Sequence, residues 1–223
     1  MTHTVYRNAT VYTPAGVLED GYLVVDTQGK LKQVGQGFPA APDGAVVDLQ
    51  GATVLPGLID VHVHGGNGSN VMDGTYESVD AVSRYHAANG TTSFLATTGT
   101  ASDERLGRAL ACIAAAIKQG VSGAEVIGIH QEGPFLNEKR KGAQPREFIR
   151  LPERTEMEKY YALSEGRIKL VTLAPEVEGG QQAVRWYRER GVTVSIGHSD
   201  AAYEQVLEAM QAGANHTTTH FNG

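Results

Sequence analysis

Two histidines spaced two residues apart, His62 and His64, end the first long apolar run of the chain, which begins near Val54. On a β-strand, residues i and i+2 point to the same side, so both imidazoles can face one cavity at the carboxyl end of the strand. Imidazoles arranged in this way can hold one metal ion. For this motif alone, a hydrogen-bonded pair of structural histidines is an equal alternative.

A carboxylate and two further histidines close other apolar runs. Glu132 lies between an apolar run and a Gly-Pro turn, where a carboxylate favours a nearby cation, and His198 and His220 follow two later runs. Any one of them could be structural, but together they end different candidate strands at the same end. Imidazole and carboxylate ligands suit Zn²⁺ or Fe²⁺, and an open coordination position activates water for attack on a carbonyl carbon. The candidate ligands for one or two divalent ions are His62, His64, Glu132, His198 and His220.

These residues fall on a repeated pattern. After Gly51, short apolar runs alternate with helix-length segments, which is typical of βα units around a parallel sheet. Periodicity does not distinguish a doubly wound sheet from a TIM barrel. Ser102 and Ser199 are the expected N-caps of two of the helices. The predicted strands are 53–63, 92–98, 125–130, 168–174, 192–196 and 216–220, and the predicted helices are 76–88, 103–119, 153–165, 180–190 and 201–212.

The first part of the chain has a different pattern. From Thr4 to about Gln50, short strand-like runs are separated by Gly and Pro, which predicts a small antiparallel sheet module. We therefore expect two domains, a small β module over 1–52 and the βα unit over 53–223.

Composition narrows the class of protein. The chain has 223 residues, 41% of them hydrophobic, and a net charge of −6, so it should fold as a soluble globule and is not expected to bind nucleic acid. A single cysteine, Cys112, excludes an internal disulfide framework. The N-terminus does not resemble a signal peptide, and no run approaches the roughly 18 apolar residues of a membrane span. We expect a cytoplasmic protein without a membrane partner.

Several segments resemble known sequences. Pro56-Gly-Leu-Ile-Asp-Val-His-Val-His-Gly65 is similar to the first-strand signature of the amidohydrolase superfamily. His130-Gln-Glu-Gly-Pro-Phe-Leu-Asn137, Leu173-Ala-Pro-Glu176 and Gly197-His-Ser199 resemble the N-acetylglucosamine-6-phosphate deacetylase family, and the similarity extends along the chain from about residue 5. This resemblance implies an α/β fold, a TIM-type barrel with a small N-terminal β-sandwich module, and a homodimer.

The resemblance also implies an activity, the metal-dependent removal of acetate from the small molecule N-acetylglucosamine 6-phosphate to give glucosamine 6-phosphate. Glu132 and His198 match metal ligands of the family, and His62 and His64 match a pair that holds a second metal in some members. One of the matched substrate contacts is a glutamine where the family commonly has histidine. The matches to substrate contacts are Ala143, Gln144, Asn222 and Gly223.

The last ligand matches the family less well. Family members read Thr-His-Leu-Phe/Tyr-Asn, whereas Thr219-His220-Phe221-Asn222 is one residue shorter between the histidine and the asparagine. An ungapped match from His198 places Thr219 at the ligand position. We favour His220, because metal affinity falls sharply without a third protein ligand, and His216 is the next candidate.

The family places further functional residues after the position of Gly223. They include the aspartate that acts as general acid and base and two substrate contacts. The last two barrel strands of the family also follow this position. The resemblance therefore implies the N-terminal portion of a deacetylase, with a barrel truncated after about six strands, and the isolated chain is expected to supply only the metal-binding half of the mechanism. Two alternatives remain, a non-catalytic chain that binds metal or sugar, and another amidohydrolase acting on a cyclic amide. The latter usually carries a strand-end lysine, and none is evident here.

Overall fold

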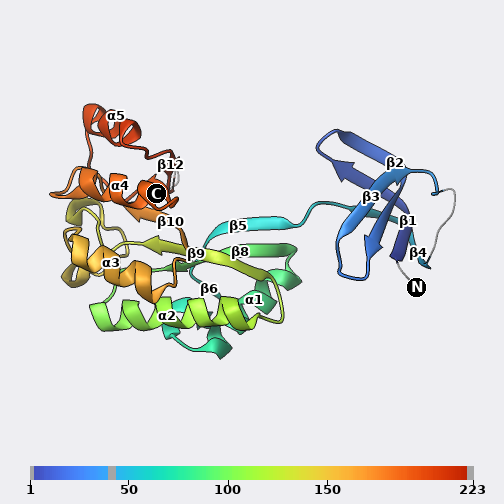
Figure 1. Cartoon of the computed structure of the whole chain (residues 1–223), viewed down its shortest axis with the longest axis horizontal. Helices are drawn as coiled ribbons and strands as arrows, with labels where there is room; N and C mark the ends of the chain where they lie inside the picture. Colours follow the sequence, from blue (N-terminus) through green and yellow to red (C-terminus); the bar gives the residue numbers. More distant parts are fainter. Residues whose placement is uncertain (1–2, 40–43, 220–223) are drawn as a thin grey trace. The chain divides into compact units, whose positions relative to one another are not determined.

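The computed structural model describes residues 3–39 and 44–219. The chain divides into two compact units, Met1–Gly57 and Leu58–Gly223. Both units are drawn in Figure 1.

The strands of the first unit form one sheet in the order β3-β2-β1-β4. β2 pairs antiparallel with β1 and with β3, in line with the predicted antiparallel module. β4 lies at the opposite edge of the sheet from β3 and runs parallel to β1. The prediction of a purely antiparallel module was therefore wrong for this strand. The strands are β1 (His3–Thr13), β2 (Gly16–Asp26), β3 (Leu31–Gln36) and β4 (Ala45–Val54).

A small apolar cluster supports this sheet. Val5, Ala9 and Val11 of β1 are at most 2% exposed, and Tyr22 of β2 is also buried. The described residues of this unit form a single layer of strands. A small sheet module is therefore confirmed, and the second layer of the expected sandwich is not among the described residues.

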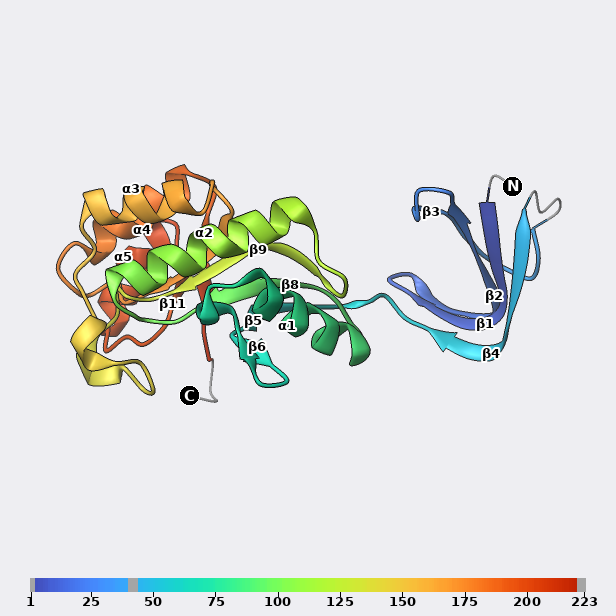
Figure 2. The same cartoon turned by 90° about the horizontal axis from the view of Figure 1, so that it is seen from below.

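The second unit contains a parallel sheet whose described strands have the order β12-β11-β10-β9-β8-β5. Every neighbouring pair is parallel, and the sheet is curled, with helices on its outer side (Figures 1 and 2). This α/β arrangement is that of part of a TIM barrel, as predicted. Its strands are β5 (Leu58–Val63), β8 (Thr91–Thr98), β9 (Glu125–Glu132), β10 (Ile168–Leu173), β11 (Thr193–Ile196) and β12 (His216–Thr217), and a separate hairpin pairs β6 (Gly65–Gly66) with β7 (Ser69–Asn70).

The first predicted strand, 53–63, was wrong in extent. Its first two residues end β4, and β5 begins only at Leu58. Pro56 lies between the two strands, and because proline has no backbone N–H it cannot continue a hydrogen-bonded ladder. One apolar run thus supplies the end of β4 and the whole of β5.

The helices agree closely with the periodicity. α1 and α2 have the predicted bounds, and the other three are slightly shorter than predicted. In the described ranges, no helix is long and apolar enough to span a membrane. The helices are α1 (Tyr76–Ala88), α2 (Asp103–Gln119), α3 (Arg154–Leu163), α4 (Gly180–Glu189) and α5 (Tyr203–Gln211), and short 3₁₀ turns are η1 (Val71–Asp73), η2 (Glu138–Arg140) and η3 (Arg146–Phe148).

One of the two predicted N-caps is present. The Ser102 hydroxyl accepts a hydrogen bond from the backbone N–H of Arg105 at 3.3 Å, and Ser102 is the N-cap of α2. Ser199 does not cap α5, whose N-cap is Ala202. The Ser199 hydroxyl donates instead to the carboxylate of Glu176 at 2.7 Å.

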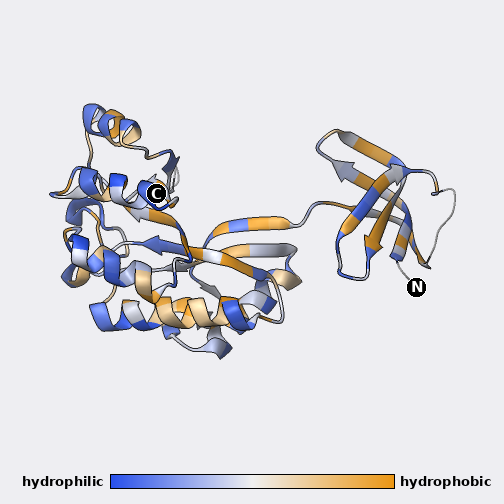
Figure 3. Ribbon diagram, viewed as in Figure 1, coloured by the Kyte–Doolittle hydropathy of each residue, from blue (hydrophilic) through white to orange (hydrophobic). Residues whose placement is uncertain are grey.

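The central strands are buried on both faces. Phe94 on β8, Ile129 on β9 and Val171 on β10 are fully buried, and α2 packs Leu110 and Ile113 into the same core. Each such side chain contributes about 1.5–3 kcal/mol through burial. Figure 3 shows the apolar colour in the middle of β9 and the hydrophilic colour at its carboxyl end. Polar side chains buried at or near these strand ends are Thr97, His130, Gln131, Glu132, Thr172 and Ser195.

Candidate metal centre

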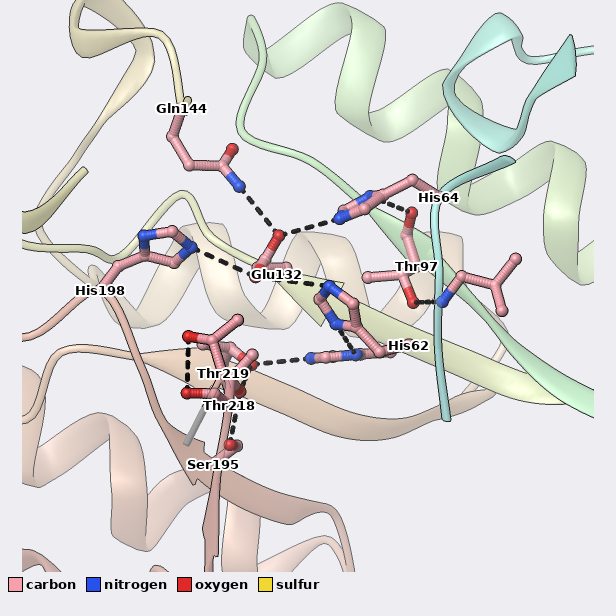
Figure 4. A network of polar contacts seen from close by, with 12 residues as sticks. His62, His64, Thr97, Glu132, Gln144, Ser195, His198, Thr218 and Thr219 are labelled. Carbon is pink, nitrogen blue, oxygen red and sulfur yellow. Dashed lines mark hydrogen bonds and ion pairs between the residues drawn. The ribbon is translucent and has the colours of Figure 1, made fainter. Parts of the chain in front are cut away.

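The carboxyl ends of the parallel strands bring the predicted ligands together. β9 ends at Glu132, His64 follows β5 directly, and His198 comes two residues after β11. Because parallel strands present their carboxyl ends at the same rim, side chains distant in sequence meet there. Figure 4 shows His64, His198 and Gln144 all pointing toward Glu132.

Glu132 is the centre of this arrangement and is 2% exposed. Its Oε2 lies 3.1 Å from Nε2 of His64, and its Oε1 lies 3.2 Å from Nε2 of His198. Gln144 donates from Nε2 to Oε2 at 2.8 Å, and Nε2 of His62 is 4.0 Å from Oε1. We call His64, His198 and Glu132 the rim cluster.

Backbone carbonyls fix the orientation of both rim imidazoles. Nδ1 of His64 lies 3.0 Å from the carbonyl oxygen of Thr97, and Nδ1 of His198 lies 3.0 Å from that of Arg140. A carbonyl oxygen only accepts, so each Nδ1 carries the proton and each Nε2 faces the carboxylate. In a neutral ring this Nε2 is an acceptor, and two acceptors facing a carboxylate require a proton or a cation between them. Histidine ligands of metal ions are commonly oriented by the same second hydrogen bond.

The electrostatics agree with this geometry. Burial is the largest single influence and raises the pKa of the Glu132 carboxyl. The hydrogen bonds from His198 and His64, together with the charges of His62 and His64, outweigh burial and hold this pKa below its usual range. The hydrogen bond to Glu132 raises the pKa of His64 and also that of His198. The carboxylate is therefore ionised, and its surroundings favour positive charge. The donor set, one carboxylate oxygen pair and imidazole nitrogens, fits a divalent ion such as Zn²⁺ or Fe²⁺.

His62 belongs to a second polar cluster that extends into the sheet. Its Nδ1 lies 3.3 Å from Nδ1 of His130, whose Nε2 lies 2.7 Å from Oγ1 of Thr172. Thr218 Oγ1 lies 2.7 Å from Thr172 Oγ1 and 2.6 Å from the Ser195 hydroxyl. Burial lowers the pKa of His130 to about 3, so this ring is neutral at ordinary pH. We call these five residues the interior cluster.

Two hollows adjoin the rim cluster. One, of about 220 Å³, is lined by His64, Ala143 and Gln144 among others. The other, of about 560 Å³, is lined by residues that include His198, Gly142 and Thr219. Both open beside the histidines that contact Glu132.

Most of the predicted ligands lie together. The ligand atoms of His62, His64 and Glu132 are all within 4.8 Å of one another, and His198 joins them through its contact with Glu132. The candidate ligand His220 and the predicted substrate contacts Asn222 and Gly223 lie outside the described residues.

The described part of the last strand shows where two alternative ligands lie. The Thr219 hydroxyl donates to the carbonyl of Thr218 at 2.8 Å, and Thr219 has a φ of 52°, which is rare for a β-branched residue. His216 is exposed on β12 and lines a cavity of about 370 Å³ together with His62 and His130. His216 therefore lies beside the interior cluster.

Gln144, a predicted substrate contact, has another role in the structure. Its Nε2 donates to Glu132, and its Oε1 accepts from the backbone N–H of Thr100 at 2.8 Å. The amide thus ties the carboxylate to the segment that follows β8. Ala143 lines the hollow beside it.

Sequence reasoning missed some residues that shape the site. Thr97 and Arg140 act through backbone carbonyls, for which a sequence carries no signal. His130 was part of a motif but received no role. A signal was present, because His130 and Glu132 are two residues apart on one strand and therefore face the same side. Thr172 is linked to the site through its contact with His130, which the sequence does not indicate.

Fold and site define a hydrolase-like α/β barrel unit with histidines and a carboxylate at its strand ends. A model of the amidohydrolase family matches residues 53–222, and the chain belongs to this family. The amidohydrolase family is metal-dependent, and this chain has a His-His-Glu cluster able to hold a metal ion.

Three known proteins make the similarity more specific. The N-acetylglucosamine-6-phosphate deacetylase of Vibrio furnissii is 39% identical over 92% of this chain and 51% of that protein. The N-acetylgalactosamine-6-phosphate deacetylase of Escherichia coli O157:H7 is 35% identical over 100% of this chain and 57% of that protein. A structure of N-acetyl-D-glucosamine-6-phosphate deacetylase from Mycobacterium smegmatis, in complex with N-acetyl-D-glucosamine-6-phosphate, superimposes with a TM-score of 0.90 at 33% identity, over 100% of this chain and 56% of that chain. The chain spans about half the length of the curated relatives it matches.

Proposed function

We propose that this chain binds a divalent metal ion, Zn²⁺ or Fe²⁺, and that the site serves the removal of acetate from N-acetylglucosamine 6-phosphate. One observation carries the metal proposal. His64 and His198 both direct Nε2 at the buried carboxylate of Glu132 while their Nδ1 atoms are held by backbone carbonyls. We assign Glu132 and His198 as ligands, with His62 and His64 able to extend the site to a second ion.

A third ligand comes from the last strand in this proposal. We assign it to His220, with His216 as the alternative. Metal content of His220→Ala and His216→Ala distinguishes the two. Loss of metal is expected for His220→Ala alone, and a His220→Ala variant that retains its metal would contradict the assignment.

The chemistry follows from the residues around the site. A divalent ion, when bound, supplies a Lewis acid that activates water and stabilises negative charge on the carbonyl oxygen. Glu132 and His198 would hold it, and Gln144 keeps the Glu132 carboxylate in place through its bridge to Thr100. The hollow lined by His64, Ala143 and Gln144 leaves room for a substrate amide beside the ligands.

The substrate proposal is supported by the relatives. Two of those described above are named for N-acetylglucosamine 6-phosphate and one for N-acetylgalactosamine 6-phosphate. These sugars differ at one hydroxyl group, so both belong in the test. We further propose a homodimer located in the cytoplasm, which the family resemblance and the acidic, cysteine-poor composition favour. Sedimentation of the chain would measure the oligomeric state.

Calorimetric titration of the metal-loaded chain tests the function. We expect N-acetylglucosamine 6-phosphate to bind only when metal is present, and N-acetylglucosamine without the phosphate to bind more weakly. N-acetylgalactosamine 6-phosphate serves as the competing substrate, and acetate release is measured in the same samples. Glu132→Gln should abolish the metal-dependent binding. A metal-loaded chain that binds neither sugar phosphate would contradict the substrate proposal.

A further inference from the structure

The backbone at His198 is in an unfavourable conformation. Its φ is 49°, in the left-handed region that residues other than glycine enter only infrequently. Such conformations persist when the surrounding structure over-determines them, and they concentrate at functional sites. Something must therefore hold the segment that carries this imidazole.

Glu176, in the segment after β10, contacts the two residues that follow His198. Its Oε2 accepts from the hydroxyl of Ser199 at 2.7 Å, and its Oε1 accepts from the backbone N–H of Asp200 at 2.7 Å. Oε1 also accepts from Nδ2 of Asn137 at 2.8 Å. The backbone N–H of Asn137 in turn donates to the carbonyl of His198 at 3.0 Å. One carboxylate thus connects the segments after β9, β10 and β11.

The same contacts reach the imidazole ring. Asp200, whose N–H is held by Glu176, forms an ion pair with the guanidinium of Arg140 at 2.8 Å. The carbonyl of Arg140 accepts from Nδ1 of His198 at 3.0 Å. Backbone and ring of His198 are both fixed by groups that connect to Glu176.

We propose that Glu176 is a positioning residue, which holds His198 in its left-handed conformation so that Nε2 faces Glu132. This inference rests on the proposed metal site. The carboxylate oxygens of Glu176 are occupied by three donors from the segments after β9 and β11, so Glu176 acts through His198. Partners of this kind commonly change metal affinity about 10- to 100-fold when they are removed.

Two substitutions separate position from charge. Glu176→Ala removes all three acceptor contacts. Glu176→Gln keeps one oxygen for Asn137 and Asp200, and its amide can donate to the Ser199 hydroxyl, which has a free lone pair or can turn. A positioning role therefore predicts that glutamine preserves the site and alanine does not. Glu178→Ala is the matched control, because Glu178 is exposed two residues further along the same segment.

The experiment measures Zn²⁺ affinity and, without metal, amide hydrogen exchange at Asp200 and Asn137. For Glu176→Ala we expect affinity to fall at least tenfold and exchange at both amides to rise. For Glu176→Gln and Glu178→Ala both quantities should stay within about threefold of the parent. Ser199→Ala removes one of the three contacts to Glu176, together with the hydrogen bond that the Ser199 hydroxyl accepts from the backbone N–H of Ala201 at 3.1 Å. It should lower affinity by a smaller factor, which provides a test if Glu176→Ala does not fold.

Some results would overturn the inference. Unchanged affinity in Glu176→Ala, or in Ser199→Ala if Glu176→Ala does not fold, would exclude a positioning role. If Zn²⁺ affinity fell as far in Glu176→Gln as in Glu176→Ala while amide exchange at Asp200 and Asn137 stayed unchanged, the charge of Glu176 and not the position of His198 would be what matters. If the parent chain binds no metal, the proposed function fails, and the exchange measurement still tests whether Glu176 orders the segment around His198.

Discussion

The rim cluster and the interior cluster use the same residue type in opposite ways. In the rim cluster, His64 and His198 face a carboxylate, and contact with Glu132 raises the pKa of both rings. In the interior cluster, burial lowers the pKa of His62 and of His130. The two clusters adjoin each other at His62, which is 4.0 Å from Glu132 and 3.3 Å from His130.

The opposite pKa shifts in the two clusters indicate what each cluster is suited to do. Rings that face a buried carboxylate with Nε2 favour a cation between them, which suits metal binding. Rings that face each other and hydroxyl groups must stay neutral, because burial of a charge without a partner is costly. We therefore expect substitutions in the rim cluster to change metal affinity. Substitutions of the interior residues other than His62, which is also a candidate ligand, should change mainly the free energy of unfolding.

The largest effect is expected for Glu132→Gln. This change removes the charge at the centre of the rim cluster. We expect Zn²⁺ affinity to fall by about 100-fold or more, since a carboxyl group binds metal in its deprotonated, charged form and a glutamine amide carries no charge. Titration with a competing chelator measures the affinity. Glu125→Gln is the matched control, because Glu125 begins the same strand and is exposed. Equal affinity in Glu132→Gln and Glu125→Gln would contradict the assignment.

His198→Ala should have the next largest effect. The ring contributes one nitrogen to the proposed site, and its removal leaves Glu132 with one imidazole contact fewer. We expect metal affinity to fall more than tenfold, measured by the same titration. His86→Ala, on α1, removes an imidazole outside both clusters and should leave affinity unchanged. Loss of metal in both variants would point to a general effect on folding.

Thr172→Val should affect stability and leave metal binding nearly intact. The Thr172 hydroxyl contacts His130 and Thr218, and its loss leaves a buried nitrogen without a partner. We expect the free energy of unfolding to fall by about 1–3 kcal/mol. Urea denaturation of the metal-free chain measures it, with the exposed Thr92→Val as control. A large loss of metal affinity without a loss of stability would show that the two clusters act as one functional unit.

The smallest effect is the pH dependence of the metal-free chain. The pKa values of His64 and His198 are raised in the folded state, so protonation of these rings stabilises the fold. This contribution is complete below about pH 6.5 and is lost as the pH rises through the pKa values of the folded state. His130 acts in the opposite direction. Its pKa of about 3 means that stability falls as the pH drops from about 6.5 toward 3. Nuclear magnetic resonance titration of the imidazoles checks both signs, and a His130 ring that titrates near pH 6.5 would contradict the distinction between the clusters.

Much of the fold could be predicted because it depends on local patterns. The apolar periodicity placed α1 and α2 at their bounds, and the Ser102 cap followed from its position before an amphipathic segment. The run from Val54 was divided incorrectly, because apolar character continues across Pro56 while the hydrogen-bonded ladder does not. Ser199 was assigned wrongly as a cap because its hydroxyl bonds to Glu176, which is distant in sequence.

The positions of four candidate ligands could be predicted from the sequence, and the groups that orient them could not. His62, His64, Glu132 and His198 were found because parallel strands bring their carboxyl ends to one rim. The groups that orient them could not be found, because the carbonyls of Thr97 and Arg140 are common to any residue. Hydrogen bonds between segments far apart in the chain depend on the paths of the loops, which periodicity does not specify.

X-ray absorption at the zinc edge of the Zn²⁺-loaded chain tests the central claim most directly. The rim cluster predicts a first shell of nitrogen and oxygen atoms at about 2.0–2.2 Å, with outer-shell scattering from at least one imidazole, that of His198. Glu132→Gln should lose this signal. A first shell containing sulfur, for which Cys112 is the one possible cysteine ligand, or a shell of oxygen atoms without imidazole scattering would show that the metal binds elsewhere.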